Sequence, residues 1–443
     1  MILQLIRYFV AIGLVSLLCG TVSAYDMVPN GKQNKPVLLI NGTIHTITGA
    51  TIENGQLLFE NGKILAIGKE LKTPPDCEVL DITDKHVYPG MISPDSSIGH
   101  IEINSVRATV DTGELGDLNP SLRAEVAVNP DSEVIPVTRA NGVLFAHVTP
   151  LTSRGGRIAG KSALIKLDGW TTEEMILEAP VSMRLSWPRD PQVRVFDIEP
   201  SSIANPKKAE ETYAESIKKL EEAFDDARAF TKAKSVQGDR LAVDLGMEAM
   251  EPVLNGELPV HIEASTARQI RDAVLWANKE GVNAVIVGGY DAWRVTDLLK
   301  QYDIPVIVGR VNSPPTRRWE SFDSRFKNAA KLHAAGVRFA IGYSNREANE
   351  RNLPYEAGKA VAHGLPLKEA LKALTIYPAE ILGVSDRIGS LEVGKDASLI
   401  VTSGNPMDVR TNVEMAFIDG RAVDLSSRHT QLYNKYEQRY QQN

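Results

Sequence analysis

The chain has 443 residues, of which 43% are hydrophobic and 24% are charged, and its formal net charge is −7. This length supports a large core and one or two domains, and the composition is ordinary for a globular protein, which argues against a disordered or fibrous chain. A negative net charge without any long basic run also argues against nucleic acid or anionic membranes as the main partner.

The first 24 residues have the pattern of a secretory signal peptide. Arg7 precedes an apolar stretch over residues 8–18, and residues 22–24 (Val-Ser-Ala) have the small side chains that signal peptidase requires. We therefore predict cleavage after Ala24, a secreted or periplasmic location, and no stable membrane span after signal removal. The alternative is an N-terminal membrane anchor, for which the apolar stretch is short.

Cysteine usage adds one constraint on the exported chain. Cys19 and Cys77 are the two cysteines of the sequence, and removal of the signal would leave Cys77 alone. An internal disulfide is then excluded, so the stability of the chain must come from its hydrophobic core.

Both ends of the mature chain have the pattern of β-structure. Residues 36–89 contain short apolar runs separated by Asn-Gly turns, which supply the positive φ that tight hairpins need. Residues 385–425 repeat this pattern, and the polar residues 426–443 are predicted to form a tail.

Between these segments, residues 90–384 alternate short β-branched runs with helices that repeat apolar residues at intervals of three and four. This alternation is typical of βαβ units around a parallel sheet, so the fold class is α/β. We count seven strands, and residues 203–256 have a helical pattern without an eighth. A closed TIM-like (β/α)8 barrel is favoured over an open sheet, because the units continue without a reversal point.

One segment matches the sequence pattern of a nucleotide-binding motif, but the structure predicted around it differs from the one that the motif requires. Residues 155–162 fit G-x-x-x-x-G-K-S, yet the following "SALIKLDG" has the pattern of a strand where phosphate binding needs a helix. We interpret the segment as a glycine loop after the second barrel strand. That edge of a barrel faces the active site, so Lys161 is a candidate for binding an anionic group.

Two carboxylates follow predicted barrel strands, Asp95 after the first and Glu263 in "PVHIEAS". They are candidates for a general acid/base pair, provided that burial raises one of their pKa values. Arg310, at the end of "IPVIVGR", is a second candidate for substrate binding. The alternative is that both carboxylates form salt bridges with Lys161 or Arg310 and only fill the barrel mouth. His147 and His261 are interpreted as hydrogen-bonded structural residues.

The layout resembles the amidohydrolase superfamily, in particular its imidazolonepropionase-like branch. The resemblance covers nearly all of residues 36–425, and its most specific segments are "NLPYEAGKAVAHGLPLKEALKALTIYPAEILGV" and "DRIGSLEVGKDASLIV". It implies a TIM-like barrel over residues 90–384 and a composite β-sandwich domain built from residues 36–89 and 385–425. It also implies a hydrolase that acts on carbon–nitrogen bonds other than linear peptide bonds.

The resemblance further implies a divalent metal, but the positions where ligands are expected do not carry them. A His-x-His pair is replaced by Asp95-Ser96-Ser97, and the other expected positions carry Ser265, Gly288, and Ser344 or Asn345. Serine and glycine side chains do not hold a catalytic divalent ion. We therefore predict a degenerate metal site and no cofactor.

Three alternatives stay open at this level. The protein is a hydrolase on a small-molecule substrate, or a non-catalytic binding protein that uses the vacant barrel as a ligand pocket. The acidic loop within residues 100–140 is solvated, or its carboxylates at Asp111, Glu114 and Asp117 replace the missing metal ligands. The sequence does not give the oligomeric state, and it is compatible with a homo-oligomer.

Overall fold

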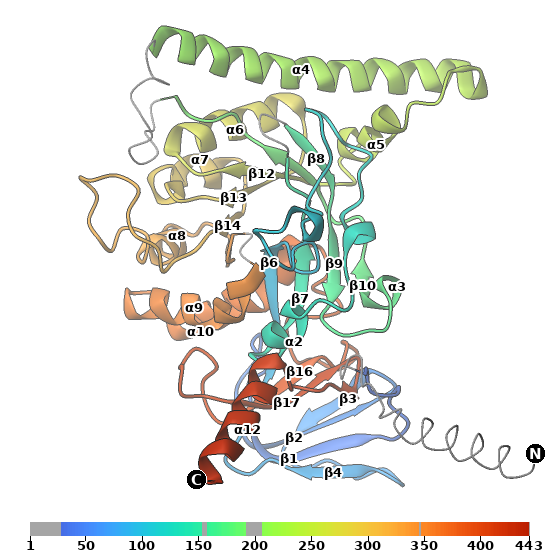
Figure 1. The fold of residues 1–443 in the computed structure, drawn as a ribbon, viewed down its shortest axis with the longest axis vertical. Coiled ribbons are helices and arrows are strands. Elements are labelled where there is room, and N and C mark those ends of the chain that lie inside the picture. The colour runs from blue at the N-terminus through green and yellow to red at the C-terminus, as the bar shows by residue number, and fades with distance from the viewer. Residues whose placement is uncertain (1–27, 153–156, 192–205, 345–346, 443) are drawn as a thin grey trace, which may run out of the picture.

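The computed structural model describes residues 28–152, 157–191, 206–344 and 347–442. The predicted signal peptide and cleavage site, the first two glycines of the motif at 155–162, and Asn345 lie outside the described residues. Figure 1 shows a layered α/β body with a smaller β-rich part beneath it. No helix of the described ranges is long and apolar enough to cross a membrane.

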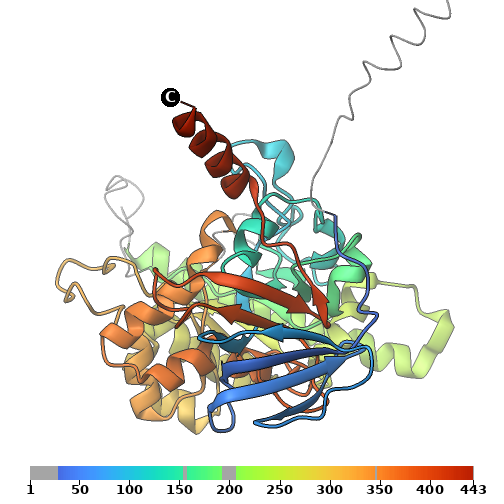
Figure 2. The same cartoon turned by 90° about the horizontal axis from the view of Figure 1, so that it is seen from below.

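The β-rich part is one eight-stranded sheet to which both ends of the chain contribute (Figure 2). Its strands lie in the order β18-β17-β16-β5-β1-β2-β3, and β4 also pairs with β1. Their bounds are β1 Val37–Ile44, β2 Ile52–Glu60, β3 Lys63–Gly68, β4 Glu78–Asp81, β5 His86–Pro89, β16 Leu399–Thr402, β17 Val413–Ile418 and β18 Arg421–Ala422.

Local turn chemistry explains two hairpins of this sheet. Asn61 and Gly62 join β2 to β3 with φ angles of 51° and 77°, and Asp419 and Gly420 join β17 to β18 with 50° and 72°. Two successive left-handed residues twist in the same sense as the strands that they connect, and Asn-Gly and Asp-Gly adopt them readily. These turns fix the register of both hairpins.

The larger part contains the strands of the predicted barrel. Their bounds are β6 Met91–Ser96, β7 Val143–Val148, β8 Ile158–Lys161, β9 Ala163–Lys166, β10 Ile176–Glu178, β11 Met183–Ser186, β12 Val260–Ala264, β13 Ala284–Gly288, β14 Val306–Val308 and β15 Phe339–Ile341. One sheet has the order β10-β9-β7-β6 and the other β15-β14-β13-β12-β11-β8. Ser162 separates β8 from β9 and so connects the two sheets.

Seven barrel strands were predicted from the sequence, and the segment 158–166 is the eighth. It runs antiparallel to both neighbours, since β9 pairs with β7 and β8 pairs with β11 in that sense. The described residues 206–256 contain helices and no strand, as their pattern predicted, so the eighth strand comes from an earlier part of the chain. Residues 149–152 and 157, the described part of the connection from β7, contain no helix, so the segment does not show the strand–helix alternation by which the others were counted.

Helices cover the outer side of these strands. The α-helices are α2 Val134–Arg139, α3 Thr172–Met175, α4 Pro206–Gln237, α5 Leu245–Leu254, α6 Ala267–Glu280, α7 Thr296–Gln301, α8 Asn328–Ala335, α9 Leu353–Ala362, α10 Leu367–Leu374, α11 Ile376–Ile381 and α12 Arg428–Gln441. The 3-10 helices are η1 Arg107–Thr109, η2 Ala124–Ala127, η4 Gly238–Arg240, η5 Ala292–Arg294 and η6 Glu347–Asn352. Figure 1 shows α4 lying across the end of the molecule farthest from the β-rich part.

The inward face of the strands is divided into a polar and an apolar half. Strand register places Arg184 beside His261, and His261 beside Val285, so the three side chains share one face of the sheet. Val285 and Val287 pack with Ile307 in a small apolar cluster that is separate from the main core. The polar half is therefore confined to β6, β7, β11 and β12.

Candidate functional site

Arg184 is the centre of the polar half. Its Nη1 donates a hydrogen bond to Asp95 Oδ1 at 3.0 Å, and its Nη2 donates to Glu263 Oε2 at 3.5 Å. Arg184 is 1% exposed and Asp95 is 3% exposed, whereas the side chain of Glu263 is 52% exposed. The site thus consists of a buried ion pair with one carboxylate that reaches solvent.

Asp95 lies on β6, and the hydroxyl of Thr149 donates a second hydrogen bond to its Oδ1 at 3.2 Å. Burial raises the pKa of Asp95, the guanidinium of Arg184 opposes that rise, and the negative charge of Glu263 adds to it. A substrate in the barrel mouth does not reach this carboxylate, because its surface is almost fully covered by protein.

Glu263 lies near the carboxyl end of β12, directly opposite Ser186 of β11. The Ser186 hydroxyl donates to Glu263 Oε2 at 3.2 Å, and the Thr152 hydroxyl donates to Ser186 Oγ at 3.1 Å. These bonds and the guanidinium orient the carboxylate while leaving about half of it accessible. Glu263 is therefore placed to accept a proton from a bound molecule.

The two inward histidines differ in their hydrogen bonding. His147 is bonded at both nitrogens, Nδ1 to Pro94 O at 2.8 Å and Nε2 to Ser162 Oγ at 2.7 Å, as the structural interpretation expects. His261 is fully buried, and neither of its nitrogens has a hydrogen-bond partner within the described residues. Burial lowers the pKa of His147 to about 4 and that of His261 well below its usual value, and Arg184 lowers both further.

Two further buried acids lie beside this cluster on η6. Ser97 donates a hydrogen bond to Glu347 Oε2 at 3.3 Å. Glu350 is fully buried, and burial raises its pKa to about 8, with the hydroxyls of Ser93 and Ser96 opposing that rise. Sequence reasoning missed both glutamates, although the acidic residues of "NREANERN" directly follow the last barrel strand.

Lys161 and Arg310 do not pair with the two carboxylates. Lys161 lies opposite Met183, one residue before Arg184, so alternation along the strand places its side chain on the other face of the sheet. The Arg310 guanidinium lies 5.5 Å from the centre of the Tyr343 ring and donates to Asn312 O at 3.3 Å. Asp95 and Glu263 form their salt bridges with Arg184 instead, a residue that the sequence analysis did not consider.

The donors of the barrel centre do not fit the divalent metal that the resemblance implies. Within the described ranges, no group of three or more His, Cys, Asp or Glu side chains is arranged to hold a metal ion. At an effective dielectric constant of about 20, two unit charges 4 Å apart interact by ~4 kcal/mol. A divalent ion beside the Arg184 guanidinium would face roughly twice that repulsion.

The acidic loop does not enter this site. Asp111 and Glu114 line a separate cavity of about 440 Å³ together with His100. The backbone oxygen of Asp117 accepts a hydrogen bond from Arg157 N at 2.7 Å. The acidic loop therefore lines a cavity of its own beside the barrel.

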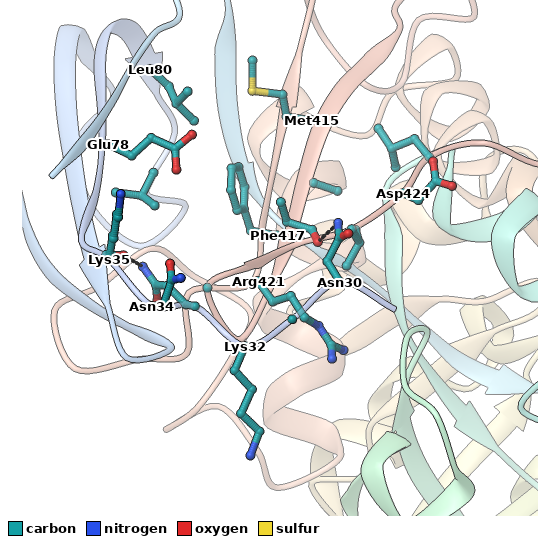
Figure 3. Close-up of a pocket in the computed structure, with 18 of the residues that line it drawn as sticks. Asn30, Lys32, Asn34, Lys35, Glu78, Leu80, Met415, Phe417, Arg421 and Asp424 are labelled. Atoms are coloured by element: carbon teal, nitrogen blue, oxygen red, sulfur yellow. Dashed lines mark hydrogen bonds between the residues drawn. The ribbon is translucent and has the colours of Figure 1, made fainter. Parts of the chain in front are cut away.

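A pocket of about 560 Å³ lies in the β-rich part, between residues 30–35, β4 and β17 (Figure 3). Asn30 Nδ2 donates to Ala422 O at 2.8 Å and ties the N-terminal segment to β18. Leu80 and Phe417 contribute apolar lining, and none of the candidate residues of the barrel contacts this pocket.

Comparisons with known proteins agree with the fold. The model of the amidohydrolase family matches residues 312–423. The solved structure of an amidohydrolase from Thermotoga maritima is 28% identical, with a TM-score of 0.77, over 88% of this chain and 99% of that one.

Two characterised proteins are similar in sequence over most of this chain. The amidohydrolase tasK of Hapsidospora irregularis is 22% identical over 88% of this chain, which spans only 43% of the length of that relative. The imidazolonepropionase of Geobacillus kaustophilus is 22% identical over 79% of this chain and 84% of its own length. The chain therefore belongs to the amidohydrolase superfamily and is a distant homologue of imidazolonepropionase.

Proposed function

We propose that this protein is an exported hydrolase of carbon–nitrogen bonds other than linear peptide bonds, which works on a small molecule at the mouth of a TIM-like barrel. The observation that carries the proposal is Glu263, a half-exposed carboxylate oriented by Ser186 and Arg184 at the carboxyl end of a parallel strand. The mouth formed by these strand ends is where barrel enzymes place their reacting groups.

In this proposal Glu263 acts as the general base and then the general acid. It takes a proton from a water molecule as the water oxygen attacks the carbonyl carbon, and it returns the proton to the departing nitrogen. Ser186 and Arg184 hold the carboxylate in place. Asp95 is a positioning residue that fixes Arg184, because its burial keeps it away from substrate.

Replacing Glu263 with glutamine is expected to lower kcat/KM for hydrolysis by ~10²–10⁴-fold, the usual contribution of a positioned proton-transfer group. Rates on a panel of lactams and N-acyl amines would be measured by the amine formed, and rates on cyclic imides by the carboxylic acid formed when the ring opens. Glu257→Gln is the matched control, since Glu257 is an exposed glutamate beyond the opposite end of the same strand. Unchanged turnover in Glu263→Gln would contradict the assignment.

The second candidate is a non-catalytic binding protein. The observation that favours it is the Arg184–Asp95 pair, which neutralises the barrel centre internally and leaves a single accessible carboxylate. Under this alternative, the same panel yields ligands that raise the Tm of wild-type protein and are recovered unchanged, and Glu263→Gln weakens their binding.

Export is tested by the mature terminus. When the full chain is expressed in a bacterial host, we expect a periplasmic product whose intact mass corresponds to a start at Tyr25. Replacing Ala24 with phenylalanine is expected to block cleavage, because signal peptidase requires a small residue there. Recovery of the uncleaved wild-type chain in the membrane fraction would favour the anchor alternative.

A further inference from the structure

The loop from β14 to α8, residues 309–327, is basic in a chain whose net charge is −7. It has five arginine or lysine residues and two acidic residues. Since β14 lies parallel to β13, and β13 to β12, this loop begins at the same carboxyl edge as Glu263. Barrel enzymes bind their substrates at that edge. Excess positive charge there attracts anions from solution.

Two of the five cations are neutralised, and their ion pairs fix the loop. Arg317 donates to both oxygens of Asp291, at 3.1 Å and 2.6 Å, and it pairs with Glu320 at 2.5 Å. Lys327 pairs with Asp323 at 2.5 Å. The other three cations of the loop have no carboxylate within 4.0 Å among the described residues.

These three arginines differ in their surroundings. Arg318 is exposed, so water and salt screen its charge. Arg310 lies near buried Glu356: burial raises the pKa of Glu356, and the charge of Arg310 opposes that rise. Arg325 is partly buried, and no described carboxylate forms an ion pair with it. Among the three, Arg325 therefore gains most from a bound anion.

Neutral groups hold the guanidinium of Arg325 in place. Its Nη1 donates a hydrogen bond to Ser313 Oγ at 3.0 Å, and its Nη2 donates to Thr316 Oγ1. Its Cζ atom lies over the ring of Tyr290, 3.8 Å from the ring centre. A guanidinium has five N–H donors, and these two bonds leave three of them for a ligand. The group is thus fixed, charged and able to donate to an anionic oxygen.

Tyr290 brings this guanidinium close to the proposed general base. The backbone N–H groups directly before and after Tyr290 donate to the oxygens of Ala264 and Ser265, each at 2.9 Å. These two residues directly follow Glu263 in β12 and the loop after it. Arg325 and Glu263 therefore lie on adjoining parts of the mouth, within the span of one small molecule.

We propose that Arg325, held on the ring of Tyr290, binds a carboxylate group of the substrate, so that the protein acts on amides that carry one negative charge, such as N-acyl amino acids. A single guanidinium without an acidic partner matches a single carboxylate. Arg184 is not available for this role, because it is 1% exposed and already pairs with Asp95 and Glu263. The inference rests on the proposed function for the reaction, whereas carboxylate binding does not depend on turnover.

The test titrates the full chain with two matched pairs of probes: N-acetylleucine with N-acetylleucinamide, and N-acetylphenylalanine with N-acetylphenylalaninamide. Affinities are measured by calorimetry in the wild type and in Glu263→Gln, in which slow turnover does not distort the heats. We expect each acid to bind ~10–100-fold more tightly than its neutral amide, the usual value of a hydrogen bond to a charged group. Arg325→Gln is expected to bind acid and amide equally.

Arg318→Gln is the matched control, because it removes one positive charge from the exposed part of the same loop. It is expected to keep the preference for the acids, and an equal loss in both variants would overturn the inference. Arg325→Lys retains the charge without the planar fork, and we expect a reduced preference. If circular dichroism shows that Arg325→Gln is unfolded, Arg325→Lys replaces it, and an undiminished preference in that variant overturns the inference.

Equal affinities for acid and amide in the wild type, or no binding of any probe, would also overturn it. The same holds if inorganic phosphate binds more tightly than both acids and loses that affinity in Arg325→Gln, because the site would then take a dianion. Hydrolysis is scored separately. A preference for the acids without amide cleavage would refute the proposed function alone, and cleavage without the preference would refute this inference alone.

Discussion

Asp95→Asn is expected to lower the free energy of unfolding by ~3–5 kcal/mol, the usual cost of removing one partner of a buried ion pair. The substitution keeps the shape of the side chain but removes the charge that faces Arg184. Among the described residues, the guanidinium of Arg184, which is 1% exposed, would then retain only Glu263 at 3.5 Å as an anionic partner. Urea unfolding at neutral pH, followed by circular dichroism, gives the difference.

A double variant separates the value of the pair from the cost of an unpaired charge. Asp95→Leu combined with Arg184→Met replaces both partners with apolar groups of similar length, and such replacements of buried pairs are often neutral or stabilising. We therefore expect the double variant to be more stable than Asp95→Leu alone. Strictly additive losses from the two substitutions would show that the two side chains are not coupled.

Glu350→Gln is expected to stabilise the protein increasingly between pH 4.5 and 8. The pKa of Glu350 rises from 4.5 to about 8 on folding, so the folded state keeps a proton in this range that the unfolded state has lost. Its contribution to stability is fully present at and below pH 4.5 and is lost as pH rises to 8. Each pKa unit corresponds to ~1.4 kcal/mol, so the total loss is ~5 kcal/mol.

Glutamine cannot ionise, so the variant does not suffer this loss. The difference in free energy of unfolding between Glu350→Gln and wild type should be near zero at pH 4.5 and should approach its maximum at pH 8. Denaturant titrations at several pH values measure it, with exposed Glu257→Gln as the control for a lost surface charge. A difference that is independent of pH would mean that Glu350 ionises normally in the folded protein.

The sequence predicted those features that depend on neighbouring residues. The Asn61-Gly62 hairpin follows from turn chemistry within two residues. The helical pattern also predicted α6, in which the structure adds a capping box of Thr266 and Gln269 at the start and Gly281 in the left-handed conformation at the end. Strand–helix alternation in turn located the seven parallel strands around which the site is built.

The sequence could not predict features that depend on residues far apart in the chain. Arg184 lies in the strand sequence "VSMRLSW", and only the arrangement of the two sheets brings it to Asp95, 89 residues earlier. The environment of Glu350 includes Ser93 and Ser96 of β6, which are even farther away in the chain. A charge pair between distant strands leaves no motif in a single sequence. The one available signal was Arg184 itself, a charged residue between two apolar ones, Met183 and Leu185.

The sheet to which both chain ends contribute also constrains how the protein reaches its folded state. His86 of β5 meets Thr402 of β16, a partner 316 residues away. Bringing such distant segments together carries a large loop-closure entropy, and topologies rich in non-local pairs fold slowly. The edge of β5 that pairs with β16 therefore stays unpaired until residues 399–402 have been synthesised, a delay that would suit the export proposed above.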